Sequence, residues 1–138
     1  MLRKNAKVEL IKSAPLFSEC SRKHLNEIAG IADEIDLREG KELTKEGGPG
    51  REFFVLVEGT ADVRKGNRRI NQLNAGDFFG EISLITQRPR TATVIATSPV
   101  RALIITERSF RSLLERQPEI QGKVMSALAA RLGPEENL

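Results

Sequence analysis

The residue types best suited to ligand chemistry lie in one short stretch, residues 78–94. It reads Phe-Phe-Gly-Glu-Ile-Ser-Leu-Ile-Thr-Gln-Arg-Pro-Arg-Thr-Ala-Thr-Val. The pattern predicts one short helical turn over 81–86, after a glycine, and then a Pro-Arg step into a strand. A short helix that begins at a glycine exposes free backbone N–H groups, which suit an anion. Arg90 could hold the same anion through a bidentate, charge-assisted pair.

A carboxylate next to an anion site needs a separate explanation, and Glu81 stands directly after Gly80. The carboxylate fits if it accepts hydrogen bonds from hydroxyl groups of the same ligand. A phosphate together with a ribose hydroxyl satisfies both residues. Two simpler readings remain open: Arg90 as a surface salt-bridge partner, and Glu81 as a first-turn acid favoured by the helix dipole.

The composition excludes several other kinds of site. The chain has 138 residues, with one Cys and one His. A single Cys excludes a disulfide framework, a Cys-based zinc site and a Cys-ligated iron–sulfur cluster within one chain. A single His cannot build the multi-histidine metal site of a cupin-type enzyme. We therefore expect no metal, no catalytic cofactor and no enzymatic activity.

Charge and hydropathy bear on partners and location. No apolar run approaches the length of a membrane span, and the N-terminus lacks the apolar stretch of a signal peptide. We expect a cytoplasmic protein with no membrane partner. The densest basic cluster is 64–69, Arg-Lys-Gly-Asn-Arg-Arg. It is either a surface for nucleic acid or an acidic partner, or a solvated hairpin tip, because Lys65-Gly66-Asn67 is typical of a turn. The hairpin tip is the favoured reading.

The elements that must position this stretch are helices, then short strands, then helices again. The spacing predicts helices over 5–12 and over 21–31, the second capped by Ser21. His24 lies on that second helix, where we expect it to face solvent. Over 32–106, short apolar runs alternate with glycine turns at about 8–12-residue spacing, which favours an antiparallel sandwich or barrel.

Helical periodicity returns after Thr106. Phe110, Leu113 and Leu114 form one apolar stripe. A second helix follows Pro118 with an apolar residue every four positions, and Gly133-Pro134 ends it. A four-residue repeat of this kind serves equally as a lid over a ligand or as the interface of a homodimer.

Taken together, these patterns resemble the cyclic nucleotide-binding domain family. The family's phosphate-binding cassette has the form F-G-E-[L/I]-[A/S/G]-L…P-R-[A/S/T]-A-[T/S]-V. This chain matches it at 79–84 and at 89–94. The family's F-[F/Y]-V-[L/I]-x-x-G strand is similar to 53–59, and its G-D-x-F-G-E motif to 76–81. The resemblance covers nearly the whole chain.

The resemblance implies an α+β, mainly β fold: an eight-stranded antiparallel jelly-roll β-roll flanked by N-terminal helices and C-terminal hinge and lid helices. One domain then spans 1–138. Its N-terminal helices occupy 1–31, the β-roll 32–106 with the cassette at 79–94, and the C-terminal helices 107–133.

The resemblance also implies a binding site and its ligand. Arg90 looks like the arginine that pairs with the cyclic phosphate, and Glu81 like the carboxylate that accepts from the ribose 2′-hydroxyl. Thr91 is compatible with cGMP as well as cAMP, of which cAMP is the expected ligand. The implied ligand-binding residues are Gly80, Glu81, Ile82, Ser83, Arg90, Thr91 and Ala92.

The implied mechanism is conformational. Phosphate docking would move a hinge near Phe110–Leu114 and close the helix over 119–132 on the purine, which signals to a downstream protein effector. No helix-turn-helix follows that helix, so we expect no DNA binding by this chain. The alternative is a structural or protein-interaction module that keeps the fold and binds no nucleotide.

Overall fold

Two four-stranded antiparallel sheets face each other in the computed structural model, which describes residues 2–80, 83–86 and 89–131. The expected eight-stranded antiparallel roll is confirmed within these residues. One sheet has the order β1-β8-β3-β6 and the other β2-β7-β4-β5. The strands are β1 Asp33–Leu37, β2 Glu42–Thr44, β3 Glu52–Glu58, β4 Ala61–Lys65, β5 Arg68–Leu73, β6 Phe78–Phe79, β7 Thr93–Ala96 and β8 Val100–Thr106.

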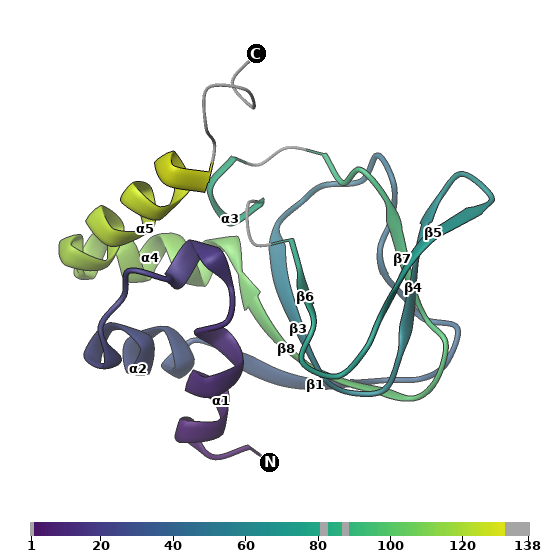
Figure 1. Cartoon of the computed structure of the whole chain (residues 1–138), viewed down its shortest axis with the longest axis horizontal. Coiled ribbons are helices and arrows are strands. Elements are labelled where there is room, and N and C mark those ends of the chain that lie inside the picture. The colour runs from purple at the N-terminus through teal and green to yellow at the C-terminus, as the bar shows by residue number, and fades with distance from the viewer. Residues whose placement is uncertain (1, 81–82, 87–88, 132–138) are drawn as a thin grey trace.

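Helices cover one end of the roll, and the β4–β5 hairpin projects from the opposite end (Figure 1). The expected helices are present, and the bounds that the structure describes agree within one or two residues. The first two residues of the expected helix over 81–86 and the expected end at Gly133-Pro134 lie outside the described residues. The Ser21 cap is confirmed, because its hydroxyl accepts the His24 backbone N–H at 3.2 Å. The helices are α1 Lys4–Ile11, η1 Pro15–Phe17, α2 Arg22–Gly30, α3 Ser83–Thr86, α4 Glu107–Arg116 and α5 Pro118–Arg131.

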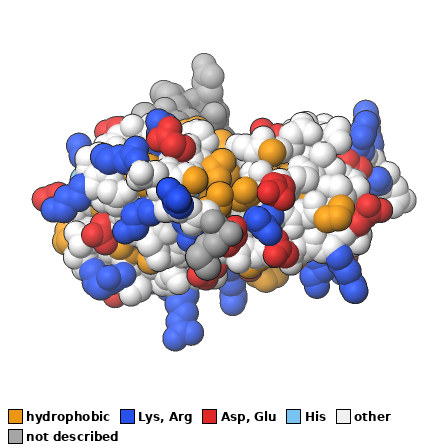
Figure 2. Space-filling view, turned by 90° about the horizontal axis from the view of Figure 1, so that it is seen from below, with side chains coloured by type: hydrophobic (Ala, Val, Ile, Leu, Met, Phe, Trp, Pro, Cys, Tyr) orange, Lys and Arg blue, Asp and Glu red, His pale blue; other side chains and the backbone are white. Residues whose placement is uncertain are grey.

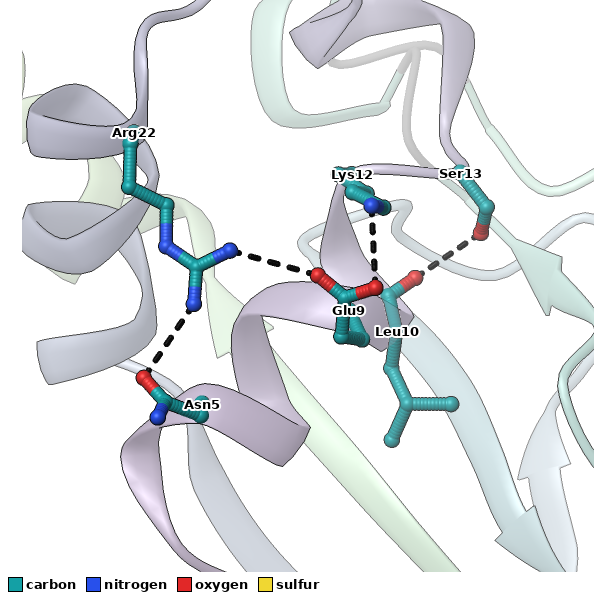
Figure 3. Close-up of polar contacts among 6 residues, drawn as sticks. All are labelled: Asn5, Glu9, Leu10, Lys12, Ser13 and Arg22. Carbon is teal, nitrogen blue, oxygen red and sulfur yellow. Dashed lines mark hydrogen bonds and ion pairs between the residues drawn. The ribbon is translucent and has the colours of Figure 1, made fainter.

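Polar contacts join α1 to α2 (Figure 3). Arg22 donates to the Glu9 carboxylate at 3.3 Å and to the Asn5 amide oxygen at 3.1 Å. Lys12 lies 2.9 Å from the other oxygen of Glu9. These side chains are about half exposed, so each ion pair contributes little to stability. Buried apolar side chains therefore hold the two helices together.

The main core lies between the helices and the β1-β8-β3-β6 sheet. The ring of Phe17 meets Phe53 and Phe110 edge to face, with centroids 5.8 and 5.9 Å apart. Ile120 and Val124 of α5 are fully buried in the same cluster. The apolar stripe of α5 therefore packs against the other helices in this structure.

A smaller core lies inside the roll, beyond the helices. It contains mostly small and medium side chains: Leu56, Ala61, Leu73, Val94, Ala96, Val100 and Ala102. The hairpin that extends beyond this core is exposed on every residue of β5 except Leu73. Figure 2 shows hydrophobic side chains gathered in the middle of one face, with Lys and Arg side chains projecting around them.

The expectation that His24 faces solvent is wrong. Its side chain is only 12% exposed, and its Nε2 atom lies 3.3 Å from a carboxylate oxygen of Glu119. The ring is held locally, because its Nδ1 atom accepts the Ser21 backbone N–H at 3.3 Å, and the contact with Glu119 joins it to a residue that the helix periodicity of α2 does not report. In the described part of the chain no helix is long and apolar enough to span a bilayer.

Candidate functional site

The backbone of Arg90 is fixed between α3 and β7 by the loop that precedes β3. Its N–H donates to the carbonyl of Gly48 at 2.8 Å, and its carbonyl accepts from the N–H of Gly47 at 2.8 Å. This pair of hydrogen bonds is a short antiparallel bridge between segments more than forty positions apart. The backbone of the arginine is therefore held at both its N–H and its carbonyl group.

The guanidinium of Arg90 points inward and is only 9% exposed. Its Nη2 atom donates to the backbone carbonyl of Glu52 at the start of β3. Gly80 lies directly beside it with φ +83°, a conformation that L side chains rarely adopt. A Cβ atom there would collide with Arg90 Nη1 and come within 2.6 Å of the Glu52 carbonyl oxygen. Gly80 thus makes room for the arginine as well as for the turn.

The electrostatics of Arg90 favour an anion. Burial lowers the pKa of the guanidinium, and the nearby Glu52 charge raises it in part. An arginine nevertheless stays protonated at neutral pH. A positive charge taken out of water is stabilised strongly by an opposite charge placed beside it, because the surroundings screen the interaction less.

The structure brings two of the expected site residues into contact and places three others. Gly80 and Arg90 meet across the cassette, as described above. Ser83 begins α3, Thr91 is exposed, and the carbonyl of Ala92 accepts the hydroxyl of Thr44 at 3.3 Å. Glu81 and Ile82 lie outside the described residues, so their expected roles remain predictions.

The cassette is joined to the helices through α3. Leu84 is 5% exposed and belongs to the same buried cluster as Phe110 of α4. Ile85 and Leu114 are partly buried against this cluster. A displacement of α3 therefore changes the packing of the first C-terminal helix, which includes the expected hinge residues.

Sequence reasoning missed the groups that hold Arg90 in place. The carbonyls of Glu52 and Gly48 and the N–H of Gly47 are backbone groups, and side-chain type gives no signal for them. Glu52 also lines a cavity of about 740 Å³ between the start of β3, the end of β8 and α4. The residues described include no cluster of three His, Cys, Asp or Glu able to hold a metal ion.

Comparison with known proteins decides the family. Residues 34–117, from β1 to the end of α4, match the family described as the cyclic nucleotide-binding domain. The chain belongs to this family. The resemblance seen in the sequence is thereby confirmed.

Relatives of this cyclic nucleotide-binding domain include fungal regulatory proteins. It is 38% identical over 118 residues to the cAMP-dependent protein kinase regulatory subunit of Mycosarcoma maydis, which covers 77% of this chain and 22% of that protein. The subunit of the same name from Hypocrea atroviridis is 32% identical over 104 residues, which cover 75% of this chain and 22% of that protein. The chain thus spans about a fifth of the length of these relatives.

Solved structures share the fold. The N-terminal domain of a transcriptional regulator from Streptomyces coelicolor A3(2) superposes with a TM-score of 0.81 and 26% sequence identity. The match covers 89% of this chain and 91% of that one. The jelly-roll β-roll with flanking helices is therefore the fold of this domain.

Proposed function

We propose that this domain binds cAMP, with cGMP as a second ligand, and that binding is signalled through the C-terminal helices to a protein effector. The observation that carries the proposal is the guanidinium of Arg90, buried against Gly80 at the entrance of the cassette. A cyclic nucleotide has one phosphate charge, which matches one buried cation. The named function of the fungal relatives supports cAMP in preference to cGMP.

The remaining ligand contacts come from the rest of the cassette. Glu81 accepts the ribose 2′-hydroxyl, and the N–H groups of Ile82, Ser83 and Thr91 complete the phosphate shell. The Thr91 side chain is exposed, which leaves its hydroxyl available to a purine. Gly80 and Ala92 allow the ligand and the backbone to approach closely.

The signal passes from the phosphate to the helices through α3. Docking of the phosphate draws the cassette inward, and Leu84 carries this movement to Phe110. The lid role of α5 requires a larger rearrangement, because Ile120 and Val124 are completely buried among the helices. Among the α5 side chains that the structure describes, Met125 is a large apolar one that is 46% exposed and therefore available without unpacking that core.

Isothermal titration with cAMP and then cGMP tests the proposal, after unfolding and refolding to remove carried-over nucleotide. We expect Arg90→Ala to weaken cAMP binding by about 2–4 kcal/mol, the cost of truncating one partner of a buried charge pair. Arg101→Ala is the matched control, because that arginine is partly exposed on β8 and pairs with Asp36. It should leave the affinity unchanged.

The role of Glu81 has its own test. Glu81→Ala should cost about 1–3 kcal/mol, as for a hydrogen bond to a charged group, and should remove the preference for cAMP over its 2′-deoxy analogue. Equal affinity of the unmodified protein for the two ligands would contradict that role. No heat and no thermal shift with either nucleotide would instead favour a protein-interaction module without a ligand.

A further inference from the structure

The β4–β5 hairpin has a distribution of charge that does not stabilise it. Arg64 lies directly opposite Arg69, and Lys65 directly opposite Arg68. Like charges opposite each other in an antiparallel pair are destabilising. β5 is the edge strand of its sheet. Charges on an edge strand commonly prevent aggregation, but preventing aggregation needs basic residues on β5 only. Here β4, which pairs with both β5 and β7, has two of them as well.

Acidic neighbours compensate only part of this charge. The Asp62 carboxylate, whose side chain is 10% exposed, lies 3.4 Å from Arg64 and 3.8 Å from Arg69. No ion pair joins Lys65 or Arg68 to an acidic side chain in the described part of the chain. Figure 2 shows Lys and Arg side chains near the end of the molecule that carries this hairpin. The Glu46 carboxylate, which accepts the N–H of Gly66 in the hairpin turn, is a second acidic neighbour. With Asp62 and Glu46 both counted, the tip still has more basic than acidic side chains, so it is a basic surface open to solvent.

An exposed aliphatic residue lies within this basic surface. Ile70 is 52% exposed and is the unmatched residue of the bulge between the Val63 and Arg64 pairings. An apolar side chain beside guanidinium groups suits a polypeptide, which offers carboxylates and aliphatic groups together. A single-stranded nucleic acid would favour aromatic side chains for stacking, and the hairpin has none. A duplex is bound by basic side chains alone, has no use for the exposed Ile70, and is a competing probe in the binding test. Four basic residues are also at the lower limit of an anionic-lipid cluster.

The tip is connected to the phosphate arginine by a short chain of hydrogen bonds. The N–H of Gly66 in the hairpin turn donates to the carboxylate of Glu46 at 2.9 Å. The N–H of Glu46 donates to the Thr93 hydroxyl at 2.9 Å. The next residue, Gly47, donates to the carbonyl of Arg90. One loop thus contacts both the hairpin turn and the backbone of the binding arginine.

We propose that the β4–β5 hairpin tip is a docking surface for an acidic segment of a protein partner, and that Glu46 couples this surface to the cassette. The proposal of a docking surface does not depend on nucleotide binding. The coupling rests on the proposed function. Nucleotide binding fixes the cassette backbone, which fixes the Glu46 loop and the hairpin turn, so the hairpin loses less conformational freedom when the acidic segment binds.

Fluorescence anisotropy tests the docking with a labelled peptide that has glutamates on both sides of one leucine. The matching glutamine peptide, a DNA duplex and phosphatidylserine vesicles serve as competing probes. We expect binding to the glutamate peptide alone, weakened by salt. Preferential binding of the duplex or the vesicles, or equal binding of the glutamine peptide, would overturn the proposal.

Variants locate the surface. Lys65→Gln with Arg68→Gln should weaken peptide binding about fivefold, and it removes a repulsion, so the protein stays folded. Ile70→Ser should weaken it about threefold. The matched control is Lys4→Gln with Lys23→Gln, which changes the net charge by the same amount at two exposed residues of the helical end. It should leave peptide binding unchanged. Equal losses in both double variants would show nonspecific attraction and overturn the assignment.

The coupling is measured by repeating the peptide titration with saturating cAMP. We expect peptide affinity to rise at least about fivefold, and cAMP affinity to rise by the same factor with saturating peptide. Glu46→Ala should abolish this change, whereas Glu46→Gln, which keeps the acceptor oxygen, should retain it. Peptide binding without nucleotide tests the docking surface alone, and calorimetry with cAMP but without peptide tests the nucleotide site alone. A failure of the docking surface is therefore distinguishable from a failure of the proposed function. An unchanged affinity in the presence of bound cAMP would overturn the coupling.

Discussion

The helical end of the molecule and the distal half of the β-roll are held together by different kinds of packing. At the helical end, the rings of Phe17, Phe53 and Phe110 interlock edge to face and are at most 1% exposed. In the distal half, the buried cluster includes Ala61 and Ala96, and the hairpin beyond it is exposed. Large aromatic side chains bury more apolar surface than alanine, so the helical end receives more stabilisation per residue.

The proposed binding site lies at the boundary between these two regions. Leu84 of the cassette belongs to the helical core, whereas Phe79, just before it, packs partly against the distal cluster and stacks on Phe54 at 4.8 Å. The cassette therefore adjoins a region packed by large aromatic side chains on one side and a region packed by smaller side chains on the other.

The largest expected effect is on stability. Phe110→Ala should lower the free energy of unfolding by about 3–5 kcal/mol, because it opens a cavity in the helical core. Leu73→Ala, at the 7% exposed edge of the distal cluster, should cost only about 2 kcal/mol. Urea denaturation of both variants measures the difference. Equal losses would mean that the two regions are equally well packed.

Cysteine reactivity probes the helical end directly. Burial raises the pKa of the Cys20 thiol from its ordinary 9.0 to about 11. Alkylation at mildly alkaline pH should therefore be about a hundredfold slower in the folded protein than in urea. Because the unfolded thiol ionises first, stability should fall as pH rises above about 9. Similar alkylation rates in both states would show that this end opens readily.

A glycine pair tests the boundary itself. Gly80 and Gly76 both have positive φ, but a Cβ atom meets nothing at Gly76. Gly76→Ala should cost about 1 kcal/mol of backbone strain and leave nucleotide binding unchanged. Gly80→Ala should cost up to about 3 kcal/mol and also weaken cAMP binding, because it displaces Arg90. Chemical denaturation and calorimetry of the two variants measure this. Equal losses of stability and equal cAMP affinities in the two variants would show that the contact between Gly80 and Arg90 has no role in binding.

The smallest expected effect belongs to the distal hairpin. Arg68→Glu replaces a like-charge pair opposite Lys65 with an attractive one. It should raise the free energy of unfolding by about 0.2–1 kcal/mol, measurable as a small increase in melting temperature at low salt. A loss of stability would show that Arg68 has a structural role, which would weaken the case for a docking surface.

The sequence by itself determined the elements and the residue types of the site. Ser21 caps its helix as expected because capping depends on neighbouring backbone N–H groups. Most strands follow from local apolar alternation and turn residues, although β6 has only two residues and is too short to show a pattern. The cassette motif indicated Arg90 and Gly80 because the chemistry of phosphate binding requires those residue types.

Only the tertiary structure decided how these residues are supported. The carbonyl of Glu52 that holds the Arg90 guanidinium, and the Glu46 loop that connects Arg90 to the hairpin, are contacts between segments distant in sequence. The contact between His24 and Glu119 is another. Such contacts depend on how the sheets and helices pack in three dimensions, and backbone groups are present at every residue. A local pattern therefore has no means of specifying them.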